Sequence, residues 1–341
     1  MGSAPPSPQQ AMPPRRRVVT WSPSVTLVPT RGCFNACSYC SFRQSIGTGD
    51  WLGDHQASAE LNARPMAFEV LLLSGEVDPV APDRSAWLSR LRALSQLALQ
   101  HGRLPHTNAG PLLRGEMAAL ARLNPSMGLM LEGLGPVYAL AHHRAPSKTL
   151  ASRLAQLEQA GRLGIPFTTG LLIGLGETQQ QRREALELLA LLQRQWGHLQ
   201  EVILQPWRPG SKAEQAKPLS SAETTDLLLT IAEAREILPP EVHLQLPPNL
   251  WPASQLIAAL EAGIDDLGGI DVTDVINPSW PQPRPTQLAQ QLEQAGWQLR
   301  PRLCVHDGWI RGLPSALRAR VVGLRQNLEA AFESGLLASG I

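Results

Sequence analysis

The sequence predicts an α/β protein folded as a parallel (βα) barrel of the TIM type, complete with eight strands. Short apolar runs alternate with segments of helical periodicity along the chain of 341 residues, a pattern typical of parallel βαβ units. About eight such units favour a closed barrel over an open doubly wound sheet. Polar side chains follow nearly every expected strand, and in a parallel barrel these strand ends meet at one face, where active sites lie.

The individual elements follow from the period of the apolar residues. The run AFEVLLLS at residues 67–74 is continuous, as in buried parallel strands. Residues 85–100 repeat at helical spacing instead, with Trp87, Leu91 and Leu94 on one face. Strands are expected at residues 25–29, 67–74, 104–109, 126–132, 167–175, 201–205, 242–246 and 265–270. Helices are expected at residues 85–100, 115–123, 149–163, 179–196, 221–238, 253–262 and 286–295.

Both ends of the chain differ from the barrel repeat. Residues 1–17 are rich in Pro, Ser and Gln and end in three arginines, which predicts a disordered tail. The tail lacks the apolar segment of a secretory signal. Residues 18–341 are expected to form a single barrel domain, whose last helix, at residues 315–337, caps one barrel end through an apolar stripe. The stripe consists of Leu317, Val321, Leu324, Leu328 and Phe332.

The composition argues against several function classes. Hydrophobic residues make up 43% and charged residues 17% of the chain, as in globular proteins, and the net charge of +1 shows no nucleic-acid footprint. No apolar run approaches the ~20 residues that a membrane-spanning helix needs. Three of the four cysteines are clustered, which indicates metal binding in a reducing compartment. We therefore expect a cytoplasmic protein that binds neither nucleic acid nor membranes.

Cys33, Cys37 and Cys40 form the strongest chemical signal, directly after the first expected strand. Thiolates at these spacings can hold three irons of a four-iron, four-sulfur cube and leave the fourth iron without a protein ligand. A structural zinc site needs four ligands, usually in two separated pairs. Cys304 and the neighbouring His306 could supply a fourth ligand, so zinc binding stays open as an alternative.

The C-x3-C-x2-C pattern, with Tyr39 just before the last cysteine, resembles the signature of the radical S-adenosylmethionine (SAM) superfamily. The resemblance implies a 4Fe-4S cluster whose open iron is chelated by the amino and carboxylate groups of S-adenosyl-L-methionine. One electron from the reduced cluster then breaks the sulfonium bond and yields methionine and a 5′-deoxyadenosyl radical. It also implies the barrel of this superfamily, with no catalytic group beyond the cofactor radical.

The same resemblance assigns residues to the cofactor. Tyr39 is expected near the adenine, and Gly75 and Glu76 at the methionine ammonium, which donates to carboxylate and carbonyl oxygens. Arg153 is expected to pair with the methionine carboxylate, to which its planar fork is suited. A solvated Glu in a turn and a solvated helix Arg are the alternatives. The remaining cofactor residues are Ser126 and a glycine turn that allows close backbone approach, formed by Gly174, Gly176 and Glu177.

Longer stretches narrow the resemblance to the CofG family, a radical SAM subunit of deazaflavin-forming FO synthases. The similarity covers roughly residues 25–310, and its strings match jointly and in order. The strings are LPHTNA at 104–109, SMGLMLE at 126–132, AGRLGIPFTTGLLIGLGE at 160–177, HLQEVILQ at 198–205, PPNL at 247–250 and GIDDLGG at 263–269.

This resemblance implies a lyase of deazaflavin coenzyme biosynthesis. Its substrate would be 5-amino-5-(4-hydroxybenzyl)-6-(D-ribitylimino)-5,6-dihydrouracil, which it would cyclise to 7,8-didemethyl-8-hydroxy-5-deazariboflavin (FO) with release of ammonia. The resemblance also implies a CofH-type partner radical SAM enzyme that makes the adduct, and a low-potential electron donor such as ferredoxin or flavodoxin. The chain holds a single cysteine motif, so the partner is expected to be a separate chain.

Polar residues at the strand ends are the candidates for substrate contacts, because a uracil edge, ribityl hydroxyls and a phenol all need hydrogen-bonding partners. Thr168 and Thr169 alternate across the fifth strand, so only one can face inward. The pattern does not say which, and Thr169 is carried as the candidate. For each candidate a purely structural hydrogen bond is the alternative. The candidates are His106, Asn108, Glu132, Thr169, Gln205, Asn249 and Asp266.

Two other functions stay open at this point. A related radical SAM barrel, either CofH-like or of the menaquinone route, would share the cysteine spacing and the fold. A non-catalytic protein that binds zinc or a cluster is the second. Product analysis separates the first from the leading hypothesis, and metal analysis separates the second.

Overall fold

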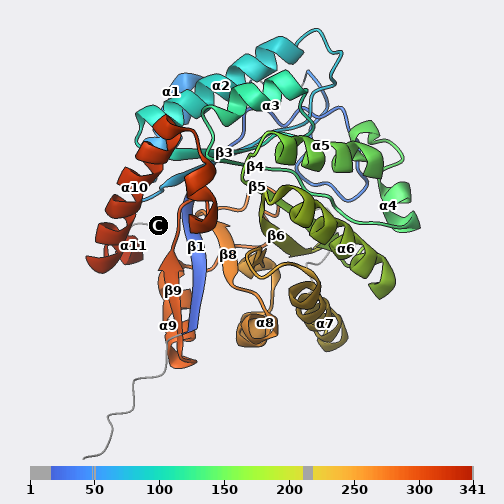
Figure 1. Ribbon diagram of the computed structural model, residues 1–341, viewed down its shortest axis with the longest axis vertical. Coiled ribbons are helices and arrows are strands. Elements are labelled where there is room, and N and C mark those ends of the chain that lie inside the picture. Colours follow the sequence, from blue (N-terminus) through green and yellow to red (C-terminus); the bar gives the residue numbers. More distant parts are fainter. Residues whose placement is uncertain (1–16, 48, 50, 210–217, 340–341) are drawn as a thin grey trace, which may run out of the picture.

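A computed structural model describes residues 17–47, 49, 51–209 and 218–339, apart from the side chains of residues 338 and 339. The strands are β1 (Arg17–Leu27), β2 (Glu69–Leu73), β3 (Leu104–Asn108), β4 (Ser126–Gly128), β5 (Phe167–Ile173), β6 (Leu199–Pro206), β7 (His243–Gln245), β8 (Asp266–Ile270) and β9 (Trp297–Pro301). In this part of the chain the strand order is β2-β3-β4-β5-β6-β7-β8-β1-β9, and β1 also pairs with β2. The predicted parallel barrel of eight strands is therefore confirmed over the described residues, with β9 outside the ring (Figure 1).

Helices form an outer layer around these strands (Figure 1). They are α1 (Asp54–Asn62), α2 (Arg84–Gln100), α3 (Arg114–Ala121), α4 (Pro136–Ala141), α5 (Leu150–Arg162), α6 (Gln179–Trp196), α7 (Ser221–Ile237), α8 (Leu256–Ala262), α9 (Pro285–Gln294), α10 (Ser315–Glu333) and α11 (Leu336–Ser339). Short 3₁₀ turns occupy Pro146–Lys148, Pro248–Leu250, Ala253–Gln255 and Asp307–Gly312. Among the described residues, no helix combines the length and the apolar character needed to cross a membrane.

Local sequence signals explain where α6 begins and ends. The Thr178 side chain accepts from Gln181 N, and the Gln181 side chain accepts from Thr178 N, so the two residues form a capping box. The helix ends at Gly197, whose φ of 65° is a left-handed conformation that glycine adopts without strain. Strand β5, ahead of this helix, is buried along its whole length. Its residues FTTGLLI, the two threonines included, are therefore covered on both faces of the strand.

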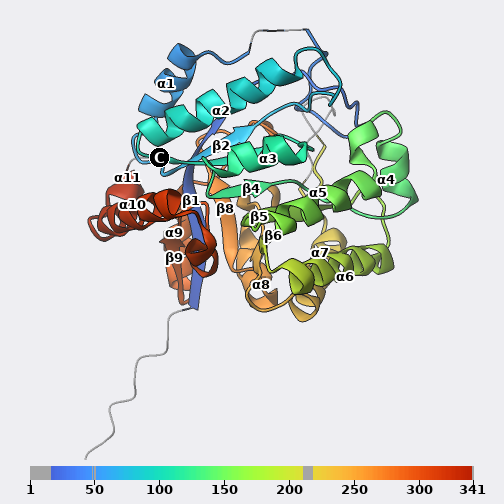
Figure 2. The same ribbon diagram turned by 45° about the horizontal axis from the view of Figure 1, so that its top comes forward.

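The amino-terminal end of the barrel is closed by the segment that follows β9. The carbonyl oxygen of Cys304 accepts hydrogen bonds from Ser126 Oγ (2.7 Å) and Gln200 Nε2 (3.0 Å), near the starts of β4 and β6. Leu303 belongs to a buried apolar cluster with Val321 of α10. Figure 2 shows α10 beside β9 at this side of the molecule. Access to the barrel interior is therefore from the carboxyl-terminal ends of the strands.

The described fold differs from the prediction mainly at the two ends of the chain. Strand β1 begins at Arg17 and not at residue 25, so Arg17 is not part of a tail, and residues 1–16 lie outside the described residues. Ser22 and Ser24 are buried inside this strand, and these polar residues interrupt the apolar pattern. Elements α1, α4 and β9 were not predicted. The final helix ends at Glu333, before α11 begins.

Candidate active site

The main cavity among the described residues opens at the carboxyl-terminal ends of the strands and has a volume of approximately 350 Å³. Its lining combines the cysteine loop with residues from several strands and from the loops that follow them. This is the convergence of distant segments that a parallel barrel produces. The predicted site residues in the lining are Cys33, Cys37, Tyr39, Cys40, Gly75, Glu76, His106, Asn108, Glu132, Arg153 and Gln205.

The cysteine loop is held in place by backbone contacts to two distant segments. Phe34 N donates to Glu76 O (3.0 Å), just after β2, and Ala36 N donates to a backbone carbonyl of the segment after α4 (2.7 Å). Gly75 is needed for this approach, because a Cβ at that position would lie 2.1 Å from Gly32 O. The loop is therefore fixed by the barrel before any ligand binds.

The three thiols of the loop are free and line the same cavity. Glu76 N donates to Cys33 Sγ (3.4 Å), a contact that favours the thiolate. Burial nevertheless raises the pKa of the Cys33 thiol, and it raises the pKa of Cys37 to about 11, because a partly dry site disfavours an isolated thiolate. Cationic iron would remove this penalty, so the number and type of donors fit an iron–sulfur cluster with one open position.

Glu76 and Arg153 form a buried ion pair at the side of this loop. Arg153 Nη2 donates to Glu76 Oε1 (2.8 Å), and Asn35 Nδ2 donates to Glu76 Oε2 (2.8 Å). Burial alone would raise the pKa of Glu76, but Arg153 and then Lys148 outweigh it and hold the pKa at about 2. Arg153 is only 1% exposed, so it is not the solvated helix arginine of the alternative interpretation.

A second buried ion pair, between Glu132 and Lys148, lies in the same wall. Burial would raise the pKa of Glu132, but Lys148 and Arg153 lower it overall. Glu132 has a φ of 77°, a conformation that costs about 1–3 kcal/mol outside glycine and occurs preferentially at functional sites. Tyr39 donates or accepts a hydrogen bond with His142 Nε2 (2.9 Å). Lys148 and His142 were missed because they lie in an irregular segment with no strand end to mark them.

The predicted glycine turn lies outside the described cavity lining. Glu177 accepts from Gly174 N (2.8 Å) and Leu175 N (2.9 Å), and its carboxylate also pairs with Arg182 (2.8 Å). Gly174 and Gly176 have φ values of 101° and 115°, so both glycines are needed for the turn itself. The carboxylate of Glu177 is thus used to hold this turn, and a cofactor contact by the turn stays a prediction.

The prediction that Thr169 faces the substrate is wrong, because Thr168 takes the inward position of the pair. Thr168 lines the cavity, whereas Thr169 Oγ1 accepts from Leu131 N (3.2 Å). Strand alternation predicts that one threonine faces inward but does not fix the phase. Ser126 is also displaced from its predicted role, since it lies at the sealed barrel end and binds Cys304 O.

Two further candidates are occupied by structural contacts outside the described lining. Asn249 Nδ2 donates to Asp274 Oδ2 (2.8 Å), because the turn after β7 directs it toward the segment that follows β8. Asp266 is the first residue of β8 and therefore lies toward the sealed end. Its carboxylate binds Arg302 Nε at 2.5 Å. Neither position supports the direct substrate contact that was predicted.

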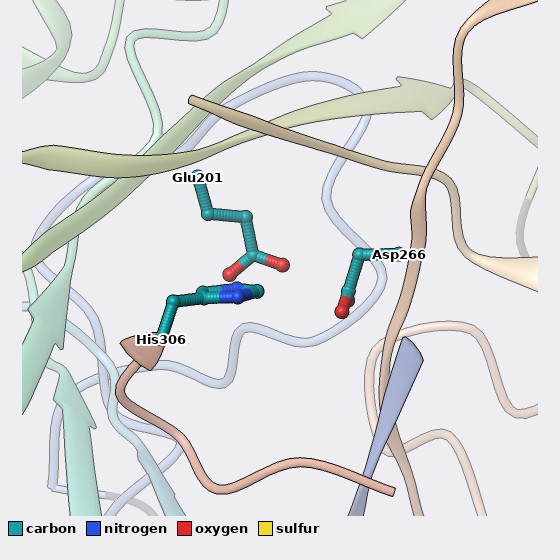
Figure 3. Close-up of side chains that lie close together, drawn as sticks. All are labelled: Glu201, Asp266 and His306. Atoms are coloured by element: carbon teal, nitrogen blue, oxygen red, sulfur yellow. The ribbon is translucent and has the colours of Figure 1, made fainter. Parts of the chain in front are cut away.

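A buried cluster of Glu201, Asp266 and His306 lies at the deep end of the barrel (Figure 3). Figure 3 shows the three side chains pointing toward one another, and their candidate ligand atoms lie within 4.8 Å, a spacing suited to a metal ion. Arg302, however, binds both carboxylates, with Nη2 at 2.9 Å from Glu201 Oε1 and Nε at 2.5 Å from Asp266 Oδ2. The guanidinium therefore supplies the positive charge of this cluster.

The pKa values of the two carboxyl groups in this cluster are shifted in opposite directions. Burial raises the pKa of Glu201 to about 8, with Arg302 opposing and Asp266 adding to the shift. Burial also acts to raise the pKa of Asp266, but Arg302 outweighs it and the pKa falls well below its usual range. Sequence reasoning missed Glu201 because it begins the expected strand at residues 201–205, whereas candidates were sought at strand ends, and it missed Arg302 because this residue lies outside every expected element.

Comparison with known proteins gives an independent view of this arrangement. The family model of the radical SAM superfamily matches residues 27–189. A 7,8-didemethyl-8-hydroxy-5-deazariboflavin synthase of Thermosynechococcus vestitus is 50% identical over 310 residues, which cover 89% of this chain and 98% of that relative. The synthase of the same name from Synechococcus elongatus is 49% identical over 320 residues, which cover 92% of this chain and 93% of that relative.

Solved structures show the same fold at much lower identity. The FeFe-hydrogenase maturase HydG from Carboxydothermus hydrogenoformans has a TM-score of 0.67 at 21% identity, covering 89% of this chain and 70% of that chain. Methylornithine synthase PylB has a TM-score of 0.58 at 13% identity, covering 83% of each chain. These similarities show that other proteins share this barrel fold, but they carry no information about the substrate of this chain.

The closed parallel barrel, with three free cysteines in a C-x3-C-x2-C loop at its open end, defines a radical SAM enzyme. The relatives resolve the class further, since identity of about one half extends over nearly their whole length. Within the superfamily, this chain belongs to the 7,8-didemethyl-8-hydroxy-5-deazariboflavin synthase family.

Proposed function

We propose that the chain cyclises 5-amino-5-(4-hydroxybenzyl)-6-(D-ribitylimino)-5,6-dihydrouracil to FO and releases ammonia, in deazaflavin coenzyme biosynthesis. The observation that carries the proposal is the 50% identity to a named synthase over 98% of its length. The barrel is closed at its amino-terminal end and has the cysteine loop at its open end. This arrangement supports the proposal, because the chemistry needs an enclosed site next to a cluster.

The cofactors of this proposal are a 4Fe-4S cluster, held by Cys33, Cys37 and Cys40, and S-adenosyl-L-methionine. When bound, they supply a radical that abstracts a hydrogen atom from the substrate. The zinc alternative is disfavoured because Cys304 lies at the other end of the barrel. There its Sγ is 4.0 Å from the carbonyl oxygen of Leu104, the first residue of β3. It is therefore remote from the cysteine loop.

The paired charges beside the loop suit the zwitterionic end of S-adenosyl-L-methionine. Glu76 and Glu132 can accept from an ammonium group, and Arg153 and Lys148 can donate to a carboxylate. Without a ligand, the four residues pair as Glu76 with Arg153 and Glu132 with Lys148. Binding therefore exchanges partners and need not leave a buried charge unpaired, which would be costly. Tyr39, in the lining beside them, is the proposed adenine contact.

The substrate of this reaction is a small molecule, and two protein partners complete the proposal. A CofH-type radical SAM enzyme supplies the adduct, because the chain contains one C-x3-C-x2-C motif and so provides one radical centre. A low-potential donor such as ferredoxin or flavodoxin supplies the electron that starts each turnover. A reducing, cytoplasmic location fits the free thiols of the loop.

Anaerobic reconstitution tests the proposal directly. The chain is loaded with iron and sulfide and incubated with the adduct, S-adenosyl-L-methionine and a reductant. We expect fluorescent FO, ammonia and 5′-deoxyadenosine, with no consumption of tyrosine. Consumption of tyrosine would support a CofH-like enzyme instead. One zinc per chain, with no 5′-deoxyadenosine, would contradict the radical mechanism altogether.

A further inference from the structure

The main cavity is polar at its deep end and apolar along its walls. Leu71, Leu129 and Ile203 line the walls. Along β2 and β6 the change follows successive inward positions, since Glu69 precedes Leu71 and Glu201 precedes Ile203. We call the deep end the cavity floor; it consists of Glu69, His106, Thr168, Glu201 and Arg302.

His106 offers this floor a hydrogen-bond acceptor. Its Nδ1 lies 2.8 Å from Ser126 Oγ, and that hydroxyl donates to Cys304 O (2.7 Å). A carbonyl oxygen can only accept, so the Ser126 proton points to Cys304, and the proton between His106 and Ser126 must sit on Nδ1. Nε2 is then unprotonated, and no described residue forms a hydrogen bond with it, although His106 is only 7% exposed. Burial, followed by Arg302, lowers the pKa of His106 to about 3, so the ring stays neutral.

Glu201 and Glu69 add further acceptors to the floor. Glu201 accepts from Thr168 Oγ1 (3.0 Å) and from Arg302 Nη2 (2.9 Å) through different oxygens, and a carboxyl group keeps further acceptor capacity whether it is ionised or protonated. Glu69 is buried beside them, and burial raises its pKa more than Arg302 lowers it. The floor therefore offers several acceptors around one guanidinium.

The charges of the floor favour a neutral ligand. Arg302 is already paired with the Asp266 carboxylate, whose pKa lies well below its usual range, and burial raises the pKa values of Glu69 and Glu201 and so favours their neutral forms. The floor therefore has no excess charge for an ionic ligand to balance. A hydroxyl group can donate to His106 Nε2 or to a carboxyl oxygen and accept a bond as well. The acceptors come from different strands around the barrel, so a chain of several hydroxyls can satisfy them together, whereas a single phenol hydroxyl reaches one side.

We propose that the cavity floor binds the open-chain polyol of the substrate, the D-ribityl chain of the adduct, while its ring systems lie between the apolar walls nearer to the cysteine loop. The inference rests on the proposed function, which supplies the identity of the substrate. Glu69 begins β2 and Glu76 lies three residues beyond its end, so roughly 13 Å of strand and three further residues separate the floor from the cofactor residues. This length accommodates the cofactor and the substrate one above the other.

In this arrangement His106, Glu69 and Glu201 determine specificity for the polyol. Ser126 is a positioning residue, because it touches no ligand and acts by holding the His106 proton on Nδ1. This gives Ser126 a role different from the cofactor contact that the sequence predicted. It also explains why a buried, neutral histidine stands next to a serine at the sealed end of the barrel.

Binding of the product tests the inference without radical turnover. Reconstituted protein is titrated anaerobically with FO and with an analogue that carries a methyl group in place of the ribityl chain, and the two Kd values are compared by fluorescence. We expect the wild type to prefer FO. His106→Leu should lose roughly five- to tenfold of this preference, as expected for one hydrogen bond. His106→Gln should restore part of it, since its amide oxygen can accept in a similar place.

Matched variants separate recognition from folding. His55→Leu changes an exposed histidine on α1 and should keep the full preference for FO. Ser126→Ala should reduce the preference by freeing the His106 tautomer, and Ser126→Thr, which retains the hydroxyl, should restore it. Glu201→Gln keeps one acceptor oxygen and should cause a smaller loss, about two- to fivefold. Iron content and melting temperature are measured for each variant, so that a folding defect is recognised.

Three outcomes would overturn the inference in distinguishable ways. If folded His106→Leu keeps the full preference for FO over the methyl analogue, the floor assignment is wrong, and the proposed function is not affected. The same titration is made with an analogue of FO that lacks the 8-hydroxyl group, which is the phenol oxygen. If the floor variants lose their preference for FO over this analogue, the phenol end occupies the floor and the assignment is wrong. A wild type that binds neither compound and forms no FO refutes the proposed function, and the inference with it. If His106→Leu fails to fold, Ser126→Ala and Glu201→Gln provide the same comparison.

Discussion

The ion pair between Glu76 and Arg153 predicts a large loss of stability when Arg153 is replaced by methionine. The two side chains are 11% and 1% exposed, and Arg153 Nη2 lies 2.8 Å from Glu76 Oε1. Burial raises the pKa of Glu76, and Arg153 is the largest of the effects that hold it at about 2. Arg153→Met therefore leaves a buried carboxylate without its main partner. Removing one member of such a pair costs about 3–5 kcal/mol in the free energy of unfolding.

Guanidinium unfolding of the reduced protein, before cluster loading, measures this cost. The double variant Arg153→Met/Glu76→Gln should recover part of the loss, since no unpaired charge remains. Arg162 is the matched control on the same helix: it pairs with Glu158 at 2.7 Å, but the side chains are 60% and 38% exposed. Arg162→Met should cost at most about 1 kcal/mol. The reasoning fails if Arg153→Met lowers the free energy of unfolding by less than about 1 kcal/mol. It also fails if the loss in the double variant equals the sum of the losses in the single variants Arg153→Met and Glu76→Gln.

Further predictions concern the cluster and the cavity floor. Serine in place of Cys33, Cys37 or Cys40 should abolish 5′-deoxyadenosine formation, measured by chromatography after reconstitution. Cys304→Ser should keep the iron content and 5′-deoxyadenosine formation, and loss of iron would contradict the three-thiolate assignment. Burial raises the pKa of Glu201 to about 8, against an ordinary value of 4.5. The folded protein then binds this proton more tightly than the unfolded chain, so the stabilising effect is lost as pH rises from about 5 to above 8. Glu201→Gln should therefore gain stability relative to wild type over this range in thermal unfolding, and a pH-independent difference would disprove the shift.

The fold was predictable where the apolar pattern reports burial without interruption. Strand β5 is buried at every position, and it ends in the uninterrupted apolar run of Leu171, Leu172 and Ile173, which indicates this burial directly. Strand β1 is different, because Ser22 and Ser24 are buried and interrupt the apolar pattern, so the expected strand begins only at residue 25. Strand β9 pairs with β1 from far along the chain. Such a partner depends on tertiary pairing, which periodicity does not encode.

The site was predictable where a sequence motif is specific for one kind of chemistry. It was less predictable where the interacting residues are distant in sequence. The cysteine spacing and the strand-end positions of Glu76 and Glu132 placed these residues in the lining correctly. The pair of Glu201 with Arg302 joins β6 to the segment after β9, and nothing in the sequence around either residue indicates this partner. Thr169 shows a third limit, because alternation leaves two choices of phase and only the packing of the barrel selects Thr168.

The division of the site along the chain has a functional meaning. The segment that matches the superfamily, residues 27–189, contains the cysteine loop, Glu76 and Arg153, which are the proposed cofactor residues. The floor combines Glu69, His106 and Thr168 from this segment with Glu201 and Arg302, which lie beyond it. Radical generation can therefore be shared across the superfamily, while the later strands and the segment after β9 contribute residues that adapt the deep end of the barrel to a particular substrate. The cavity floor is thus the part of the barrel where substitutions should change which substrate is accepted while cluster assembly is retained.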